Sequence, residues 1–182
     1  MERDYSGELL RFIQEHPSVY HVIEGQRRIL LEAGYEQLLE SQHWTLREGG
    51  KYFLTRNHSA LIAFQVPKKR FRGFMLMASH SDSPALKVKE NPEITVGGLY
   101  KKLNVELYGG ALLAPWLDRP LSVAGRLLVR TSEGVRMQLV NVDRDLLLIP
   151  SLAIHMNRSV NDGYAFFFLM IRRPPRSTLF PY

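Results

Sequence analysis

The sequence predicts an α/β fold in which two helices precede a set of short strands and a β-rich segment follows. Apolar residues recur at helical spacing up to Ala33, whereas short apolar runs bounded by turn residues begin near Trp44. Helices followed by such strands are typical of a sheet that is covered by helices. Beyond Pro92 the pattern changes to alternating strands with frequent glycines, so we expect a separate, smaller β unit there.

Composition limits what kind of protein this is. The 182 residues are 45% hydrophobic and 23% charged, which is ordinary for a globular protein. There is no cysteine, so any bound metal must be held by His, Asp or Glu. The amino terminus is charged where a signal peptide is apolar, and the apolar run Ala165–Ile171 is far shorter than the ~20 residues of a spanning helix. We therefore expect a cytoplasmic protein that does not enter a membrane.

The basic character of the chain does not indicate nucleic-acid binding. The net charge is +6, but Arg172, Arg173 and Arg176 lie in a final segment that contains no acidic residue. The cluster Lys68–Arg72 lies between two apolar strands and has no flanking ladder of aromatic residues on which bases could stack. We expect no nucleic-acid partner.

Two helices are predicted, over Tyr5–Glu15 and Val19–Ala33. Pro17 separates them, Ser18 is a suitable N-cap for the second, and Gly34 is a suitable residue just after its end. The apolar positions that we expect to face a core are Leu9, Leu10, Phe12, Ile13, Val22, Ile23, Leu30 and Ala33.

The strands come next. Tyr52–Thr55 and Ala60–Val66 are joined by a connection short enough for a hairpin, and the uncharged run Phe74–Ser79 predicts a buried strand. The strands expected in the β unit are Val105–Tyr108, Leu121–Arg130, Val135–Val142 and Leu146–Ile149.

Polar residues follow the predicted strand Phe74–Ser79 directly. Strand alternation places His80 and Asp82 on one side, where the carboxylate could hold one imidazole nitrogen and leave the other for a metal. The spacing alone leaves a second interpretation open, a structural histidine bonded to a nearby acid. His155 is equally open, as a buried structural residue or as part of a shared site.

Three segments together resemble one family. HSDSPALKVKENPE (His80–Glu93), VELYGGALLAPWLDRPLSVAGRL (Val105–Leu127) and IPSLAIHMNRSVN (Ile149–Asn161) are similar to the M18 zinc aminopeptidases, the aspartyl aminopeptidase family, and closest to its bacterial members. The resemblance implies a zinc-exopeptidase-type α/β catalytic domain that is interrupted, after its first motif, by a β-rich dimerisation domain.

The resemblance also implies residue roles. His80 matches the first zinc ligand, and Asp82 matches the catalytic-site acid that orients this ligand. His155 matches a histidine that reaches the active site of a neighbouring subunit and contacts substrate. Structural roles in the dimerisation domain are implied for Trp116, Asp118 and Arg119.

The activity implied is removal of N-terminal residues, often Asp or Glu, from peptides with a free amino terminus. Two zinc ions per active site activate a water molecule, and a Glu transfers its proton. Because His80 and His155 would then belong to different subunits at one site, activity is expected to require a homo-oligomer built from dimers.

The sequence departs from the family pattern at several points. Ser81 stands where Thr is usual, Ala85 where Cys is common, and Pro120 where Asp is more frequent. Family members are more than twice as long, and their remaining zinc ligands and general base lie downstream. We expect residues 1–92 to be the N-terminal part of the catalytic domain, 93–165 an incomplete dimerisation domain and 166–182 a non-native tail.

Such a chain on its own is expected to lack peptidase activity and tight zinc binding, and to expose apolar surface that lowers its solubility. Two alternatives remain. The β unit could self-associate as a non-catalytic dimerisation fragment, or the chain could belong to a related zinc exopeptidase, such as a carboxypeptidase or deacylase.

Overall fold

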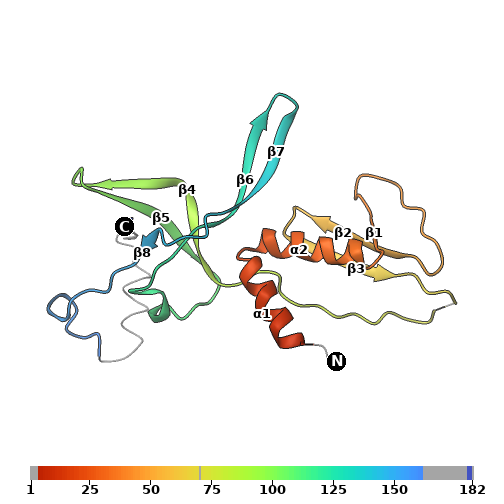
Figure 1. The fold of residues 1–182 in the computed structure, drawn as a ribbon, viewed down its shortest axis with the longest axis horizontal. Coiled ribbons are helices and arrows are strands. Elements are labelled where there is room, and N and C mark those ends of the chain that lie inside the picture. The colour runs from red at the N-terminus through yellow and green to blue at the C-terminus, as the bar shows by residue number, and fades with distance from the viewer. Residues whose placement is uncertain (1–3, 70, 162–179, 182) are drawn as a thin grey trace. The chain divides into compact units, whose positions relative to one another are not determined.

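The computed structural model describes residues 4–69, 71–161 and 180–181, which group into two compact units (Figure 1). The first unit contains the residues up to Ser83 together with Ala124–Asn141. The second contains Pro84–Val123 and the residues from Val142 onward. Neither helix of the described residues has the length and hydropathy needed to cross a membrane.

Helix α1 spans Tyr5–Glu15 and helix α2 spans Val19–Glu32, as the apolar spacing predicts. The Asp4 carboxylate caps α1 by accepting a 2.9 Å hydrogen bond from the Gly7 amide. Ser18 occupies the N-cap position of α2, but its hydroxyl lies 2.7 Å from His21 Nδ1 and makes no cap hydrogen bond. Gly34 follows α2 with a φ of 78°, which supports its predicted role after the helix end.

The apolar face predicted for α1 is not a core face in the described structure. Leu9, Leu10 and Ile13 are between 58% and 62% exposed, and α1 has no buried residue. One side of α1 is occupied by the Phe12 and His16 rings, which stack with centroids 4.2 Å apart. The prediction of a core role for Leu9, Leu10 and Ile13 is therefore wrong over the described residues.

The core of the first unit lies between α2 and a three-stranded sheet. Strands β1 (Glu36–Gln37), β2 (Lys51–Arg56) and β3 (Ala60–Gln65) lie in that order, with β1 parallel and β3 antiparallel to β2. On β2, Tyr52 and Phe53 are 1% and 0% exposed, and Ile23 of α2 is 3% exposed. The predicted hairpin of β2 and β3 is confirmed.

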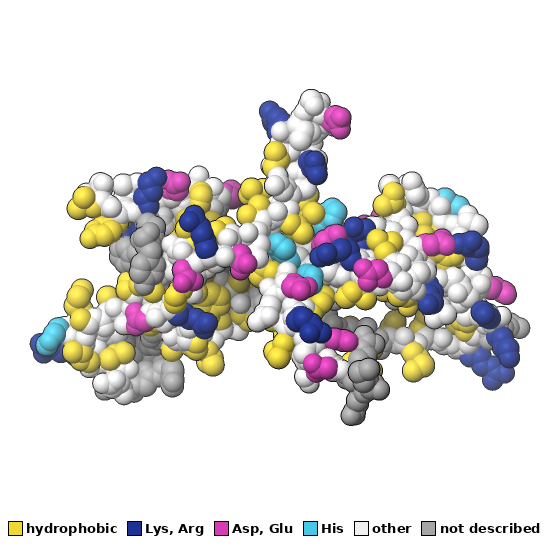
Figure 2. All heavy atoms as spheres, viewed as in Figure 1, with side chains coloured by type: hydrophobic (Ala, Val, Ile, Leu, Met, Phe, Trp, Pro, Cys, Tyr) yellow, Lys and Arg dark blue, Asp and Glu magenta, His cyan; other side chains and the backbone are white. Residues whose placement is uncertain are grey.

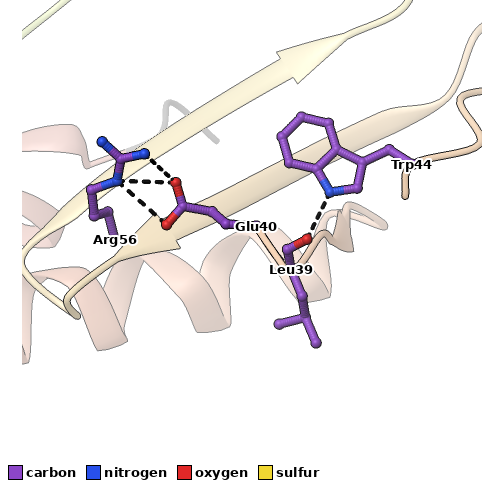
Figure 3. Close-up of polar contacts among 4 residues, drawn as sticks. All are labelled: Leu39, Glu40, Trp44 and Arg56. Atoms are coloured by element: carbon purple, nitrogen blue, oxygen red, sulfur yellow. Dashed lines mark hydrogen bonds and ion pairs between the residues drawn. The ribbon is translucent and has the colours of Figure 1, made fainter. Parts of the chain in front are cut away.

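The loop between β1 and β2 is fixed by polar contacts (Figure 3). The Trp44 indole nitrogen donates a 2.8 Å hydrogen bond to the Leu39 carbonyl oxygen. Glu40 pairs with Arg56, whose Nε lies 3.0 Å from the Glu40 Oε1 atom. Arg56 is the last residue of β2, so this ion pair secures the strand just before the β2–β3 turn.

The first unit also contains a hairpin from much later in the chain. Strands β6 (Ala124–Thr131) and β7 (Gly134–Asn141) pair without interruption from Ala124 opposite Asn141 to Thr131 opposite Gly134. Its strands match those expected from alternation at Leu121–Arg130 and Val135–Val142.

The second unit is built on a long antiparallel pair, β4 (Ala85–Val96) and β5 (Tyr100–Tyr108). The register shifts between Val88 and Glu93, so Pro92 lies in an interruption of the ladder, where a missing amide hydrogen is tolerated. The strand continues through Pro92, and the division between the two compact units lies between Ser83 and Pro84.

Short elements complete the second unit. They are the 3₁₀ turns η1 (Ala114–Trp116) and η2 (Ile154–Met156) and the strands β8 (Leu147–Leu148) and β9 (Phe180–Pro181), which pair antiparallel. The tail expected over 166–182 lies outside the described residues, except for the two residues of β9.

Candidate metal centre

His80 and Asp82 form the pair that the sequence predicts. The His80 Nδ1 atom lies 2.9 Å from the Asp82 Oδ1 atom. The chain bends at Ser81, between the two residues, and the ring and the carboxylate meet beside this bend. A carboxylate only accepts hydrogen bonds, so Nδ1 donates and the Nε2 lone pair is left for a ligand. The His80 side chain is 91% exposed and that of Asp82 33% exposed, so Nε2 is accessible.

The segment that leads into His80 differs from the prediction. Phe74–Ser79 is extended but is not a strand, and Phe74, Met75, Leu76 and Met77 are all at least 82% exposed. An apolar run on both faces needs neighbouring strands and covering helices, and within the described residues no strand pairs with this run. The prediction of a buried strand is therefore wrong for the described structure.

A hydrogen bond anchors the end of this segment to the sheet. The Ser81 hydroxyl donates to the Ser59 carbonyl oxygen at 3.2 Å. Ser59 belongs to the β2–β3 turn, in which Asn57 and His58 both have left-handed backbones with φ of 52° and 53°. Such a pair of residues is typical of the tight turns that match the twist of a hairpin.

Arg126 of β6 holds the same turn. Its Nη1 atom donates to the Asn57 carbonyl oxygen at 2.8 Å and lies 3.2 Å from the Asn57 side-chain oxygen. Its guanidinium carbon lies 4.3 Å from the centre of the Tyr20 ring of α2, a cation–π contact. Sequence reasoning missed Arg126 and Tyr20, because no local pattern reveals a contact across 69 positions.

Two ionisable side chains of α2, Glu24 and His21, have pKa values shifted by their surroundings. Arg27 bonds to both Glu24 carboxylate oxygens, at 2.8 and 2.9 Å. This hydrogen bonding, partly opposed by burial, lowers the pKa of Glu24, and the nearby charges of Arg28 and His58 lower it further. Burial lowers the pKa of His21, and His16 adds to the effect. These groups belong to the helices rather than to the His80 pair.

His155 lies in the second unit, in η2, and is exposed. The segment before it is fixed by Asp118, whose Oδ1 atom accepts a 2.8 Å hydrogen bond from the Ser151 amide. The Asp118 amide donates in turn to the Ile149 carbonyl oxygen at 2.9 Å, with Asp118 in a left-handed backbone of φ 53°. Hydrogen bonds from Ser151 lower the pKa of Asp118. Asp118 therefore joins two of the three motif segments to each other.

The other two residues of the dimerisation-domain signature lie close by. Trp116 ends η1, and the Arg119 Nη1 atom lies 3.4 Å from the Pro115 carbonyl oxygen. These contacts are local to the loop that carries Asp118.

The donors available for a metal are few in the part of the chain that the structure describes. No three side chains of His, Cys, Asp or Glu gather there in a way that could hold a metal ion. Zinc takes three or four protein ligands, and the His80–Asp82 pair fits one of them together with its orienting acid.

Comparison with known proteins matches most of the chain to one family. The model of the Aminopeptidase I zinc metalloproteases (M18) matches residues 12–167. A probable M18 family aminopeptidase 2 of Clostridium acetobutylicum is 43% identical over 90% of this chain and 39% of its own length. One of Pseudomonas aeruginosa is 42% identical over 90% of this chain and 38% of its own. The chain thus spans about two fifths of these curated relatives.

Solved structures agree. The chain matches a cryo-EM structure of the Ape4 and Nbr1 complex with a TM-score of 0.84 and 35% identity, over 95% of this chain and 33% of that one. It matches the mApe1 dodecamer of S. cerevisiae with a TM-score of 0.75 and 31% identity, over 84% of this chain and 36% of that one. This mixed α/β chain therefore belongs to the M18 family of zinc aminopeptidases.

Proposed function

We propose that this chain is the N-terminal part of a metalloaminopeptidase that removes N-terminal residues, Asp or Glu in particular, from peptides. The observation that carries the proposal is the His80–Asp82 contact of 2.9 Å, found in a chain whose residues 12–167 match the M18 model. The remaining ligands and the general base are assigned to the additional length that the relatives have. We call the protein with that length the full-length protein.

In this proposal, Asp82 prepares His80 to bind zinc. Its carboxylate accepts a hydrogen bond from the Nδ1–H group, which fixes the tautomer and aims Nε2 away from Asp82. When bound, zinc ions at such a centre polarise the peptide carbonyl and lower the pKa of a water molecule to about 7. His80 and Asp82 themselves do no proton transfer on the substrate.

His155 is proposed to act at the active site of a neighbouring subunit. Its exposure and the fixed segment before it support this role, because a residue that reaches another subunit must project from a secured loop. A related protein, the S. cerevisiae mApe1, has been solved as a dodecamer. We propose that the full-length protein forms a homo-oligomer of dimers, in which His155 contacts the substrate.

The test uses the metal-free full-length protein. Zinc content after equilibrium dialysis, and hydrolysis of Asp- and Glu-peptides with free or acetylated amino termini, are measured. We expect about two zinc ions per active site and cleavage only of peptides with a free amino terminus. Cleavage of acetylated peptides at the same rate would favour a deacylase or related exopeptidase instead. Zinc binding without peptidase activity would favour the alternative function, a non-catalytic role in dimerisation.

A further inference from the structure

We infer that Ser81 and Arg126 are positioning residues for His80: Ser81 ties the chain beside His80 to the Asn57–Ser59 turn, and Arg126 holds this turn. The inference rests on the proposed function, since it concerns how His80 meets a metal.

The first step is that the segment ending at His80 needs a contact that holds it in place. The residues before it, Phe74 to Met77, are at least 82% exposed, so within the described residues they gain little from packing. Ser81 lies between His80 and Asp82, at a bend in the chain. Its hydroxyl donates to Ser59 O at 3.2 Å while His80 and Asp82 contact each other. The hydrogen bond therefore fixes the backbone between the ligand and its orienting acid.

The second step is that the anchor point is itself rigid. Ser59 follows β2, whose residue Phe53 is 0% exposed, and the Ser59 amide donates to the Arg56 carbonyl oxygen at 3.1 Å. The left-handed backbones of Asn57 and His58 are conformations that Asn and His adopt more often than most other residues besides glycine. Contacts from other elements hold the turn in this shape more firmly.

The third step is that Arg126 supplies such contacts. It donates to the Asn57 backbone oxygen at 2.8 Å, lies 3.2 Å from the Asn57 side-chain oxygen, and stacks on Tyr20 at 4.3 Å. A planar guanidinium can make all of these contacts at once, whereas a lysine ammonium cannot. Arg126 thus links α2, β6 and the turn, and Ser81 carries this support on to His80.

The expected consequence concerns metal affinity. Partners that orient a metal ligand without touching the metal change affinity by about 10- to 100-fold when removed. Because Ser81 acts through the backbone of His80, we expect Ser81→Ala to weaken metal binding by about tenfold. Ser81→Thr keeps a hydroxyl donor and is expected to retain wild-type affinity. Arg126→Lys, one contact further away, is expected to cause a smaller loss in the same direction.

The experiment titrates the metal-free full-length protein with Co²⁺, whose visible absorption reports ligand geometry, and measures kcat and KM separately. Variants Ser81→Ala, Ser81→Thr and Arg126→Lys are compared with Ser83→Ala, an exposed serine two residues away. Amide hydrogen exchange at residues 79–82 is followed without metal. We expect Ser81→Ala to weaken Co²⁺ binding, alter the spectrum, lower kcat with little change in KM and speed exchange, while Ser83→Ala does none of these.

Wild-type Co²⁺ affinity and spectrum in Ser81→Ala would overturn the inference and leave the proposed function intact, as would failure of Ser81→Thr to retain affinity when it folds. A wild-type protein that binds no Co²⁺ and cleaves no peptide would overturn the proposed function itself. If Ser81→Ala does not fold, Arg126→Lys decides, because it keeps the charge and most of the side-chain volume.

Discussion

At position 82, the carboxylate does two things for the nearby His80 ring: it accepts a hydrogen bond from the Nδ1–H group and places negative charge beside it. Both effects make the far nitrogen a better donor to a metal. The exposed His80 ring makes few other contacts that could set its orientation, since 91% of its side chain is accessible. The Asp82 contact is therefore the main local contact that orients this ring.

This leads to a prediction for Asp82→Asn in the full-length protein. The amide oxygen can still accept a hydrogen bond, but the negative charge is lost, so we expect zinc affinity to fall by about 10- to 100-fold. Competition with a chromophoric chelator measures it. Glu90→Gln removes an exposed carboxylate on β4 and serves as the matched control, with no expected change. Equal affinities of Asp82→Asn and wild type would contradict the role given to Asp82.

At the scale of elements, sequence reasoning succeeded where local chemistry decides. The bounds of α1 and α2 follow from caps and breakers such as Pro17 and Gly34, and the β2–β3 hairpin follows from its short polar connection. The buried strand predicted for Phe74–Ser79 is wrong for the described structure. An apolar run indicates that a segment needs apolar neighbours to be buried, but it does not show whether the chain supplies those neighbours. The Arg126–Asn57 contact was beyond reach, because it depends on tertiary folding across 69 positions.

In the candidate site, too, one contact follows from local sequence spacing and another depends on tertiary folding. The His80–Asp82 contact joins residues two apart and could be predicted from their spacing, although the chain bends at Ser81 between them. The anchoring of Ser81 on Ser59 could not, since it depends on how the segment returns along the sheet. The roles of His80, Asp82 and His155 and the domain ranges stay predictions.

The loop that joins Asp118 to Ser151 allows a pH prediction. Hydrogen bonds from Ser151 lower the pKa of Asp118 below its ordinary value of 3.8. Because the pKa is lowered on folding, the contact is fully present above pH 3.8 and is lost as the pH falls through the lowered pKa. We expect the Ser151 amide resonance in NMR spectra to titrate with a midpoint below 3.8.

Asp118→Asn is the control for this titration. It keeps an oxygen acceptor of the same shape but cannot titrate, so the Ser151 resonance should no longer move with pH in this range. A midpoint at or above 3.8 in the wild type would mean that the Asp118 contact does not form in solution.

At the scale of the whole molecule, much apolar surface is exposed. Figure 2 shows hydrophobic side chains over both compact units, and Leu76 is 92% exposed. The chain spans about two fifths of its curated relatives, so we expect the remaining length to cover the run that contains Leu76. Leu76→Lys should then raise the soluble fraction of the 182-residue chain and lower the melting temperature of the full-length protein. An unchanged melting temperature would show that Leu76 stays uncovered.

The proposed sharing of an active site between subunits predicts complementation. Full-length His80→Gln and His155→Gln variants should each be inactive as separate homo-oligomers. In a mixed dimer, one site would receive both changes and the other neither, so an equal, randomly mixed pair should recover about a quarter of wild-type activity. Peptidase assays after co-expression measure this. No recovery, with mixed oligomers demonstrated by tagged pull-down, would place both histidines in one subunit.

The two ends of the β6–β7 hairpin lie close together, so the hairpin can be removed while the chain on either side of it is rejoined. The Val142 amide donates to the Val123 carbonyl oxygen at 3.1 Å, so the chain leaves for the hairpin and returns at nearly the same point. Residues 124–141 can therefore be excised and Val123 rejoined to Val142 through a short glycine turn, giving a continuous β-rich polypeptide. It should start at Pro84, because starting after Pro92 would leave Val105, Leu107 and Tyr108 without their cross-strand neighbours.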